Sequence, residues 1–371
     1  MKHILFILPY LNLGGTEKQA YSLIEKLTDT YKISLLAPQG DGAKPFQQLP
    51  IKYIPFTKWE VNFFKGITEV IKGIKEIKKE KTIDLVHVHA AHELMLPVKL
   101  VLPKTPLVFT VHGYHGSGTN ISYKLACLFS NFCADNVISV CQTEFDILSQ
   151  FGLKKEKLNL IYNGVKKPIT DTNKSLEFAN QFNFDPQKNI VIGTAARLNE
   201  AKGLTYLLQG FAQAQMQLSQ SNIAEKNLIL IIAGTGELET SLKEEAENLG
   251  IANQVIFTGY VDDLLNLMQL FDIFVLPSLQ EAASLACVEA MSLGKAIIGT
   301  SVGGIPEQVE DNVNGFIIEP RNPQQIADKL IKLIKNNSLR QEFGQNSYQR
   351  YQENFSSDMM IAKTVELYEA T

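Results

Sequence analysis

Short apolar runs rich in β-branched residues alternate with amphipathic stretches along the chain of 371 residues. Runs of this kind are typical of strands buried on both faces, and the stretches between them, such as residues 17–27 and 63–81, have the spacing of helices. This alternation predicts parallel sheets covered by helices on both faces. The expected strands are residues 4–8, 34–36, 52–54, 84–89, 107–111, 136–139 and 158–161, followed by 190–194, 228–233, 255–258, 273–276, 296–300 and 315–318.

One break in this pattern divides the chain. Asn163-Gly164 is a turn signal, Pro168 ends any regular element, and a polar stretch follows before the next expected strand. We therefore predict an α/β protein of two Rossmann-like, doubly wound domains, residues 1–165 and 166–351, facing across a cleft. Ligands of such sheets bind beyond the carboxyl ends of the strands, so residues that directly follow strands are the candidates for a site.

Composition and charge narrow the class of protein. Hydrophobic residues make up 45% of the chain, enough for sizeable cores, and the formal charge of −4 gives no sign of nucleic-acid binding. Residues 1–165 hold 19 Lys, no Arg and 14 acids, a balance of +5 that leaves −9 for the remainder. An anionic acceptor or a membrane surface explains this split, and so do ordinary solvated faces. The four cysteines form no CxxC pair, and we expect them to be reduced packing residues.

The chain carries no signal for membrane insertion. The apolar run before Pro9 is too short for a signal peptide, and no window of 18 apolar residues occurs, so we expect a soluble, cytoplasmic protein. Peripheral contact with the inner face of the plasma membrane stays open. Residues 58–81 carry seven Lys against four acids, with Trp59, Phe63 and Phe64 nearby, which fits docking on an anionic membrane or a lipid-linked acceptor. The apolar positions of the same stretch also fit an ordinary core-facing helix: Ile67, Val70, Ile71, Ile74 and Ile77.

Two glutamates eight residues apart follow the expected strand 273–276. Glu281 lies in the loop, and Glu289 lies within a helix that we expect to begin near Ser284. The free N–H groups of a helix N-terminus favour an anion, and a carboxylate is a good acceptor for the vicinal hydroxyls of a ribose or hexose. A glutamate on a helix is usually a solvated surface residue, but the residues around Glu289 are small and apolar. The pair therefore indicates a sugar site.

A basic pair follows the expected strand 190–194. Arg197 is one of only four arginines in the chain, and Lys202 lies where the next helix should begin. Together they would bind a diphosphate and stabilise the charge on a departing nucleotide, although a surface pair is the alternative. The turn at Gly14-Gly15 after the first strand would let backbone N–H groups approach a phosphate. No GxGxxG occurs, which argues against a nicotinamide or flavin enzyme.

Five of the six histidines lie between residues 87 and 115. We expect His87 and His89 to point to opposite faces of their strand, which is poor geometry for one metal. A zinc site of His89, His92 and Glu93 is conceivable, but no cysteine supports it. His112 directly follows the expected strand 107–111 and is better placed to face the cleft. No Asp-x-Asp occurs, so we expect no metal and no other cofactor.

Taken together, these stretches resemble glycosyltransferase family 4, a family of retaining GT-B enzymes. The resemblance covers nearly the whole chain and is strongest in the second half. Its motifs are modest singly but specific in their order and spacing: residues 193–203, Ala233-Gly-Thr-Gly-Glu237, Phe257-Thr-Gly-Tyr260, residues 277–294 and Gly303-Gly-Ile-Pro-Glu307.

The resemblance implies how a nucleotide diphosphate sugar would be bound. Glu281 would contact hydroxyls of the donor sugar and Glu289 the ribose, while Arg197 and Lys202 would bind the diphosphate. Tyr260 would border the base. The donor would also touch the residues that open the helix: Ala283, Ser284 and Leu285.

The resemblance also implies roles for the first half. Gly14 and Gly15 would close over the diphosphate from the other domain, and His112 would face the transferred sugar. We expect Glu17 to contact the acceptor. The stretch 352–371 resembles the family's last helix, which crosses back to the first domain.

One departure from the family concerns the sugar pocket. The family often has Gly-Phe-Gly after the first glutamate, and here Ala282-Ala-Ser stands in its place, which puts the sugar's identity in doubt more than the activity. The resemblance implies transfer of a hexose from a UDP- or GDP-sugar to a glycan or lipid-linked acceptor, with front-face attack and retention. Alternatives are a sugar-nucleotide epimerase or a phosphorylase of the same architecture, and a non-catalytic nucleotide-sugar-binding module.

Overall fold

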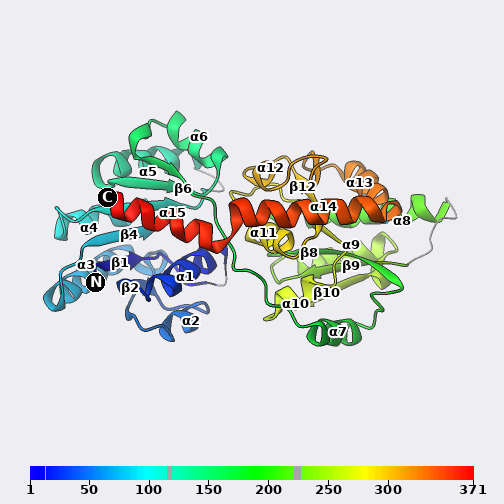
Figure 1. The fold of residues 1–371 in the computed structure, drawn as a ribbon, viewed down its shortest axis with the longest axis horizontal. Coiled ribbons are helices and arrows are strands. Elements are labelled where there is room, and N and C mark those ends of the chain that lie inside the picture. The colour runs from blue at the N-terminus through cyan, green and yellow to red at the C-terminus, as the bar shows by residue number, and fades with distance from the viewer. Residues whose placement is uncertain (13, 115–118, 221–226) are drawn as a thin grey trace. The chain divides into compact units, whose positions relative to one another are not determined.

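The computed structural model of the chain describes residues 1–12, 14–114, 119–220 and 227–371. The chain divides into two compact units (Figure 1). Unit 1 consists of Met1–Lys166 together with Ser357–Thr371, and unit 2 consists of Lys167–Ser356. Each unit has its own parallel sheet and its own hydrophobic cores.

Unit 1 is built on a seven-stranded parallel sheet of order β3-β2-β1-β4-β5-β6-β7. The order reverses between β1 and β4, where Ile4 lies opposite Leu85. Nearly every residue of β1, β2, β4 and β5 is buried, because helices cover both faces, and this burial explains the continuous apolar runs in the sequence. The strands are β1 His3–Ile7, β2 Lys32–Pro38, β3 Lys52–Phe56, β4 Leu85–His89, β5 Leu107–Val111, β6 Asn136–Ser139 and β7 Leu158–Leu160.

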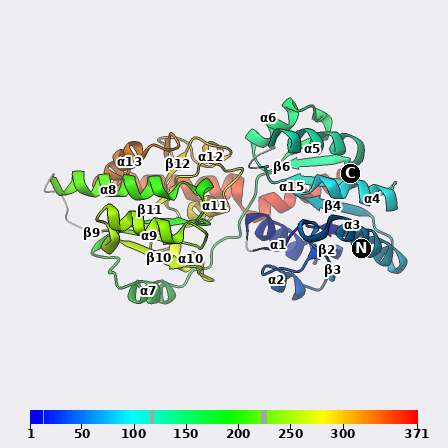
Figure 2. The ribbon, with the colours of Figure 1, turned by 180° about the vertical axis from the view of Figure 1, so that it is seen from behind.

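Helices cover the two faces of this sheet in separate groups. One face carries α1 (Gly15–Leu27), α2 (Ala43–Gln47) and the C-terminal helix α15 (Ser357–Ala370), which share one core (Figure 1). The other face carries four helices over a second core (Figure 2). These are α3 Trp59–Glu80, α4 Met95–Val101, α5 Thr119–Cys133 and α6 Gln142–Gln150.

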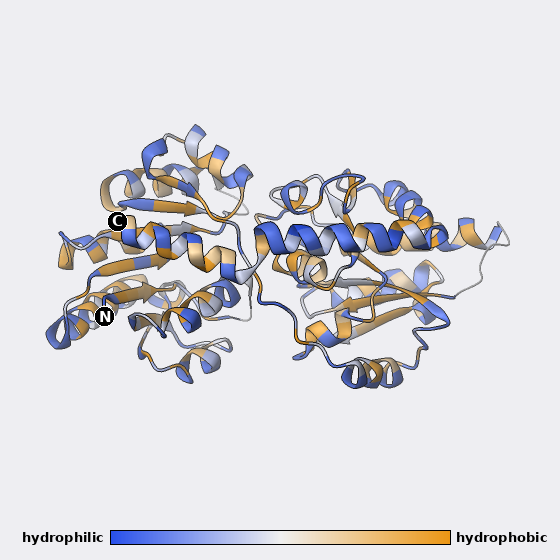
Figure 3. Ribbon diagram, viewed as in Figure 1, coloured by the Kyte–Doolittle hydropathy of each residue, from blue (hydrophilic) through white to orange (hydrophobic). Residues whose placement is uncertain are grey.

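Unit 2 is built on a six-stranded parallel sheet of order β10-β9-β8-β11-β12-β13. Its strands are β8 Asn189–Ala195, β9 Asn227–Ala233, β10 Val255–Gly259, β11 Ile273–Leu276, β12 Ala296–Thr300 and β13 Gly315–Ile318. Its helices are α7 Thr172–Gln181, α8 Leu204–Gln220, α9 Glu239–Asn248, α10 Leu264–Met268, α11 Leu285–Ser292, α12 Ile305–Gln308, α13 Pro323–Lys335 and α14 Asn337–Arg350. Hydropathy separates these layers, since the strands are mostly hydrophobic while α14 is hydrophilic along most of its length (Figure 3).

The two doubly wound parallel sheets confirm the predicted fold class. All expected strands are present, with ends that differ by no more than two residues. Several helix boundaries differ from expectation, and α1 begins at Gly15, two residues early. Helix α3 begins at Trp59 and is interrupted at Asn62, and the stretch expected to form the last helix from residue 352 starts with a π-helical turn, Tyr351–Phe355, before α15. No helix in the described part of the chain has the length and hydropathy of a membrane span.

Close packing of α8 on α13 gives a stability prediction. Gly→Ala within a helix usually stabilises by about 0.5–1 kcal/mol. At Gly210, however, a Cβ would lie 2.6 Å from the side chain of Ile326 and 2.9 Å from the carbonyl oxygen of Pro323. We expect Gly210→Ala to lower the free energy of unfolding by about 1–3 kcal/mol, as overpacking does. Urea unfolding measures this, with the exposed Met216→Ala on the same helix as control; an unchanged or higher stability would contradict the packing.

Candidate functional site

Strand order in unit 2 reverses between β8 and β11 at the middle of the sheet. Crossover connections from these two strands run in opposite directions, and open α/β sheets bind ligands at such a reversal, beyond the carboxyl ends of the strands. Arg197 and Lys202 lie in the loop after β8, and Glu281 lies in the loop after β11. The structure thus brings the predicted basic pair and the predicted acidic residues to the same edge of one sheet.

The loop after β8 is fixed by backbone hydrogen bonds to the loop after β9. The amide of Ala196 donates to the carbonyl oxygen of Ala233 at 3.0 Å, and that of Leu198 donates to Thr235 at 2.9 Å. Gly234 permits this approach, because a Cβ there would lie 2.0 Å from the oxygen of Ala196. Arg197 between these contacts is exposed, and among the described residues its guanidinium has no hydrogen-bonding or ionic partner. An unpaired cation held on a rigid loop is well placed for an anionic ligand.

Lys202 and Glu281 form an ion pair between these two loops. The Lys202 Nζ lies 2.6 Å from the Glu281 Oε2, and the side chains are only 23% and 11% exposed. Lys202 does not begin a helix as expected: it ends a 3-10 turn, and Gly203 in the left-handed region precedes α8. Backbone hydrogen bonding from Leu279 N–H to the Ala201 oxygen at 2.7 Å locks the two loops together.

Glycines from the loop after β12 hold the other side of the Glu281 loop. The amide of Gly304 donates to the Ala282 oxygen at 2.8 Å. At Gly303, where φ is +53°, a Cβ would lie 1.5 Å from the backbone carbonyl oxygen of Glu281. No other residue therefore fits there without moving that loop. The Glu281 loop is therefore held from both sides, and the close approach explains why glycine is needed at position 303.

Helix α11 presents one open stripe toward this edge. Ser284 is its N-cap, and the hydroxyl accepts a hydrogen bond from the Cys287 amide at 3.2 Å. Ala283, Ala286 and Glu289, spaced by three residues, are partly exposed, whereas Leu285 and the rest of the helix are buried. The two alanines add no long side chain to this stripe beside Glu289. The first amides of a helix have no intrahelical acceptor, and here Ser284 caps that of Cys287.

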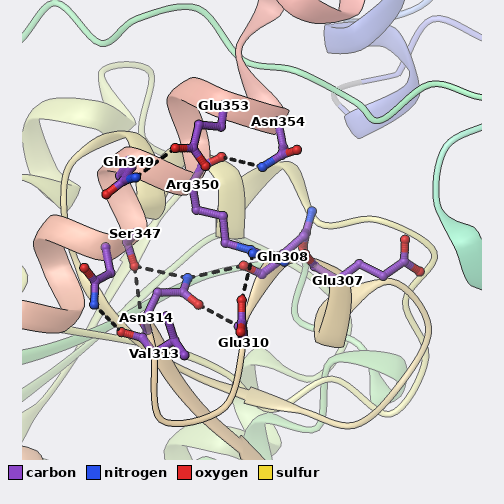
Figure 4. A network of polar contacts seen from close by, with 11 residues as sticks. Glu307, Gln308, Glu310, Val313, Asn314, Ser347, Gln349, Arg350, Glu353 and Asn354 are labelled. Atoms are coloured by element: carbon purple, nitrogen blue, oxygen red, sulfur yellow. Dashed lines mark hydrogen bonds and ion pairs between the residues drawn. The ribbon is translucent and has the colours of Figure 1, made fainter.

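A polar network supports this helix from behind, and sequence reasoning missed it. The Gln308 side chain donates to the Ser284 carbonyl oxygen at 3.1 Å. The carbonyl oxygen of Gln308 accepts from Asn314, whose side chain also bonds Ser347 of α14 (Figure 4). Arg350 lies 3.0 Å from Glu310 and donates to the Glu307 carbonyl oxygen. The one signal of this network in the sequence is the polar composition of α14. The partners of these α14 residues lie more than 30 residues away and cannot be identified from one sequence.

Tyr260 lies farther along the same edge of the sheet. It follows β10, two strands away from β8, and its side chain is 55% exposed. The amide of Gly234 donates to the Gly259 oxygen at 2.9 Å, which joins this loop to the one after β9. The Tyr260 ring is exposed and available to border a base. In the described structure Tyr260 forms no hydrogen bond with the charged residues named above.

In unit 1 the glycine turn lies at the carboxyl end of β1, beside the strand-order reversal. Gly14 is the N-cap of α1, and Gly15 is its exposed first residue. Glu17 is buried, and its carboxylate accepts a hydrogen bond from the Asn12 amide at 2.7 Å. The carboxylate thus stabilises its own turn, and the expected contact of Glu17 with an acceptor stays a prediction. Leu13 lies outside the described residues.

Histidines gather on one face of the first sheet. The expectation that His87 and His89 point to opposite faces is wrong: their ring centroids lie 4.1 Å apart, because residues two apart on a strand share a face. His89 Nδ1 lies 3.2 Å from His112 Nε2, and His87 bonds the Tyr368 hydroxyl at 2.5 Å and Thr110 at 2.7 Å. Burial lowers the pKa of His87 to about 3 and that of His112 to about 4, so both rings are neutral at pH 7.

The conceivable zinc ligands are directed elsewhere. His89 bonds His112, while His92 Nδ1 lies 3.0 Å from the Tyr114 hydroxyl. Glu93 is about half exposed and lies 3.6 Å from His92. Within residues 1–12, 14–114, 119–220 and 227–371, no group of three or more metal-ligating side chains converges. His115 lies outside these residues.

The histidine cluster predicts a pH dependence of stability. An unfolded histidine titrates near pH 6.5, well above the folded-state pKa of about 3 for His87 and about 4 for His112. At a pH below 6.5 and above these folded-state pKa values, the unfolded chain binds protons that the folded chain does not. The free energy of unfolding should therefore fall as the pH decreases from 6.5. His89→Phe, which removes one such group, should reduce that slope by up to about 1.4 kcal/mol per pH unit. Urea unfolding at pH 4.5–8 tests this; identical slopes for the two proteins would refute it.

Comparisons with known proteins identify the family of the chain. The family model "Glycosyl transferases group 1" matches residues 176–350, and "Glycosyltransferase Family 4" matches residues 13–167. The capsular polysaccharide biosynthesis glycosyltransferase CapM of Staphylococcus aureus is 25% identical over 91% of this chain and 89% of its own. An Escherichia coli UDP-Gal:alpha-D-GlcNAc-diphosphoundecaprenol alpha-1,3-galactosyltransferase is 25% identical over 88% and 86%.

A solved structure extends this agreement to the fold. Anabaena Alr3699/HepE, crystallised with UDP-glucose, has a TM-score of 0.85 at 23% identity, with all of both chains covered. The two family models adjoin along the chain and correspond to its two parallel-sheet units. The chain therefore belongs to the group 1 and family 4 glycosyltransferases and has their GT-B architecture.

Proposed function

We propose that this glycosyltransferase is a retaining hexosyltransferase. It would take a hexose-type sugar from a UDP- or GDP-sugar and pass it to a glycan or lipid-linked acceptor, in the synthesis of cell-surface polysaccharide, lipopolysaccharide or glycolipid. The observation that carries the proposal is the Lys202–Glu281 ion pair at the strand-order reversal of unit 2, with exposed Arg197 in the same loop as Lys202. Two similar proteins support it. The Escherichia coli relative is named for UDP-Gal and a diphosphoundecaprenol-linked acceptor, and Anabaena Alr3699/HepE was crystallised with UDP-glucose.

The donor would occupy the edge of unit 2 in a fixed orientation. Its diphosphate would bind Arg197, Lys202 and the first amides of α11, where positive charge is concentrated. Glu289 on the open stripe of α11 would accept hydrogen bonds from the ribose hydroxyls, and Tyr260 would border the base. Binding would loosen the Lys202–Glu281 ion pair, because the diphosphate competes for the ammonium group, and the freed carboxylate would bind the hydroxyls of the sugar. We propose no metal in this arrangement, since the two cations supply the charge.

The chemistry would be electrostatic stabilisation of a departing nucleotide. The bond from the anomeric carbon to the diphosphate oxygen breaks, and the acceptor oxygen bonds to the same face of that carbon. The departing phosphate takes the acceptor's proton, so no second carboxylate is required. Preorganised donors aimed at the growing phosphate charge lower the barrier without reorganisation during the reaction. Unit 1 would supply the acceptor side, with neutral His112 as a hydrogen-bonding group for the transferred sugar.

Replacement of the basic residues tests the electrostatic role. Arg197→Ala or Lys202→Ala should lower turnover by roughly 10²–10³, the scale for the loss of one preorganised donor. Turnover is measured as nucleotide release from UDP- and GDP-sugars with candidate acceptors, and the product separates transfer from epimerisation or phosphorolysis. Lys335→Ala, an exposed lysine on α13, is the matched control. Normal turnover in either site variant would remove that residue from the mechanism.

The ion pair predicts opposite effects on binding and turnover. Glu281→Gln removes the carboxylate that competes with a diphosphate for Lys202. UDP should therefore bind roughly two- to fivefold more tightly, the range of a modest ion pair, although turnover falls by roughly 10². Isothermal titration with UDP and turnover assays measure both. Glu342→Gln, exposed on α14, should leave both unchanged; weaker UDP binding by Glu281→Gln would show that the carboxylate does not compete for Lys202.

A further inference from the structure

Helix α5 of unit 1 is apolar on both of its sides. Its inner side packs into the core through Tyr123, Ala126 and Cys127. Its outer side carries a second stripe of large apolar residues, spaced by four, three and four positions. These are Ile121, Leu125, Leu128 and Phe132, with exposed fractions of 64%, 40%, 51% and 82%. A helix on a solvated surface normally has one apolar stripe, so the second stripe indicates another contact.

Helix α4 extends this stripe. It packs beside α5 and α3 on the same face of the first sheet (Figure 2). Leu96 and Leu100, four residues apart, are 46% and 71% exposed. We define the α4–α5 patch as these two leucines together with Ile121, Leu125, Leu128 and Phe132.

The surroundings of the α4–α5 patch are cationic. Residues 94–134 contain three lysines, Lys99, Lys104 and Lys124, and no Asp or Glu. Leu100 also borders a groove between α3 and α4 whose other lining residues are Ile71, Lys75, Lys78, Lys79 and Val101.

Several acids of α3 and of the turns around α4 and α5 have partners. Asp135 bonds Lys99 at 3.2 Å, Glu76 and Glu80 both pair with Lys52, and Glu93, about half exposed, lies 3.6 Å from His92. The lysines of the groove therefore keep their positive charge available at the rim of the patch.

We propose that the α4–α5 patch docks on the surface of an anionic lipid bilayer. A bilayer offers both chemistries that this face presents, an acyl region for the apolar side chains and phosphates for the lysines. A second copy of the chain fits less well, because a self-paired interface would bring two lysine-rich rims together. The docking surface is additional to the proposed transfer site, which lies in unit 2.

The structure moves this surface away from the stretch that sequence analysis indicated. Within residues 58–81, the apolar positions Val70, Ile74 and Ile77 are buried in the core, as the alternative of an ordinary helix requires. Phe63 and Phe64 are exposed, but the α3 residues that line the groove beside Leu100 lie farther along the helix: Ile71, Lys75, Lys78 and Lys79. The side chain of Trp59 lies outside the described residues.

Vesicle co-sedimentation of the full chain tests the proposal. We expect binding to vesicles of equal phosphatidylglycerol and phosphatidylcholine, and much weaker binding to phosphatidylcholine alone or in high salt. The triple variant Leu125→Ser, Leu128→Ser, Phe132→Ser should bind anionic vesicles at least about tenfold more weakly, since burial of each side chain contributes to binding. The variant Lys75→Gln, Lys78→Gln, Lys79→Gln should lose the preference for anionic lipid.

Matched controls separate docking from general effects. Ile169→Ser and Met216→Ser remove exposed apolar side chains of unit 2, 92% and 57% exposed, and should bind vesicles as the parent chain does. The increase in melting temperature caused by UDP-glucose should be the same in all variants. If the donor proposal fails, this increase is absent while vesicle binding is unaffected. Absence of vesicle binding by the parent chain, or unchanged binding by the leucine–phenylalanine variant, would overturn the docking proposal. Light scattering that shows a dimer lost in that variant would assign the patch to a second copy.

Discussion

An ammonium and a carboxylate meet at the strand-order reversal of the second sheet, and much of unit 2 serves to hold them there. Lys202 and Glu281 come from loops nearly 80 residues apart. Hydrogen bonds from Leu279 to Ala201 and from Gly304 to Ala282 fix both loops to the sheet edge. A partly buried carboxylate is costly when it loses its partner, so the proposed displacement of Glu281 from Lys202 by a diphosphate requires new hydrogen bonds to the carboxylate, which the sugar hydroxyls would supply.

Arg197 and the N-terminus of α11 are the other positive groups of this edge. The guanidinium is exposed and has no partner among the described residues, and the Ser284 hydroxyl caps the first turn of the helix through the Cys287 amide. The polar network behind α11 fixes the position of its N-cap through Gln308. Such preorganisation matters more for transfer than the number of contacts, because only interactions that strengthen in the transition state raise the rate.

The sequence predicts the strands well because strands of a parallel sheet are buried on both faces and appear as continuous apolar runs. Once the strands are located, the residues that follow them can be found as well. Arg197, Lys202 and Glu281 directly follow strands in the chain and so lie at the carboxyl ends of those strands. Contacts between distant segments were beyond reach, as the bond from Gln308 to Ser284 and those of Asn314 with Ser347 show. The expectation that His87 and His89 point to opposite faces was avoidable, because side chains two residues apart on a strand lie on the same face. The outward stripe of α5 could not be recognised, because its spacing does not reveal which apolar side faces the core.

A crystal structure of the protein with UDP would test the central claim most directly. The account predicts the β-phosphate within hydrogen-bonding distance of the Lys202 ammonium and the Arg197 guanidinium, the ribose at Glu289, and a longer distance between Lys202 and Glu281 than the 2.6 Å of the ion pair. A nucleotide bound away from the carboxyl edge of β8 and β11, with that ion pair unchanged, would contradict it.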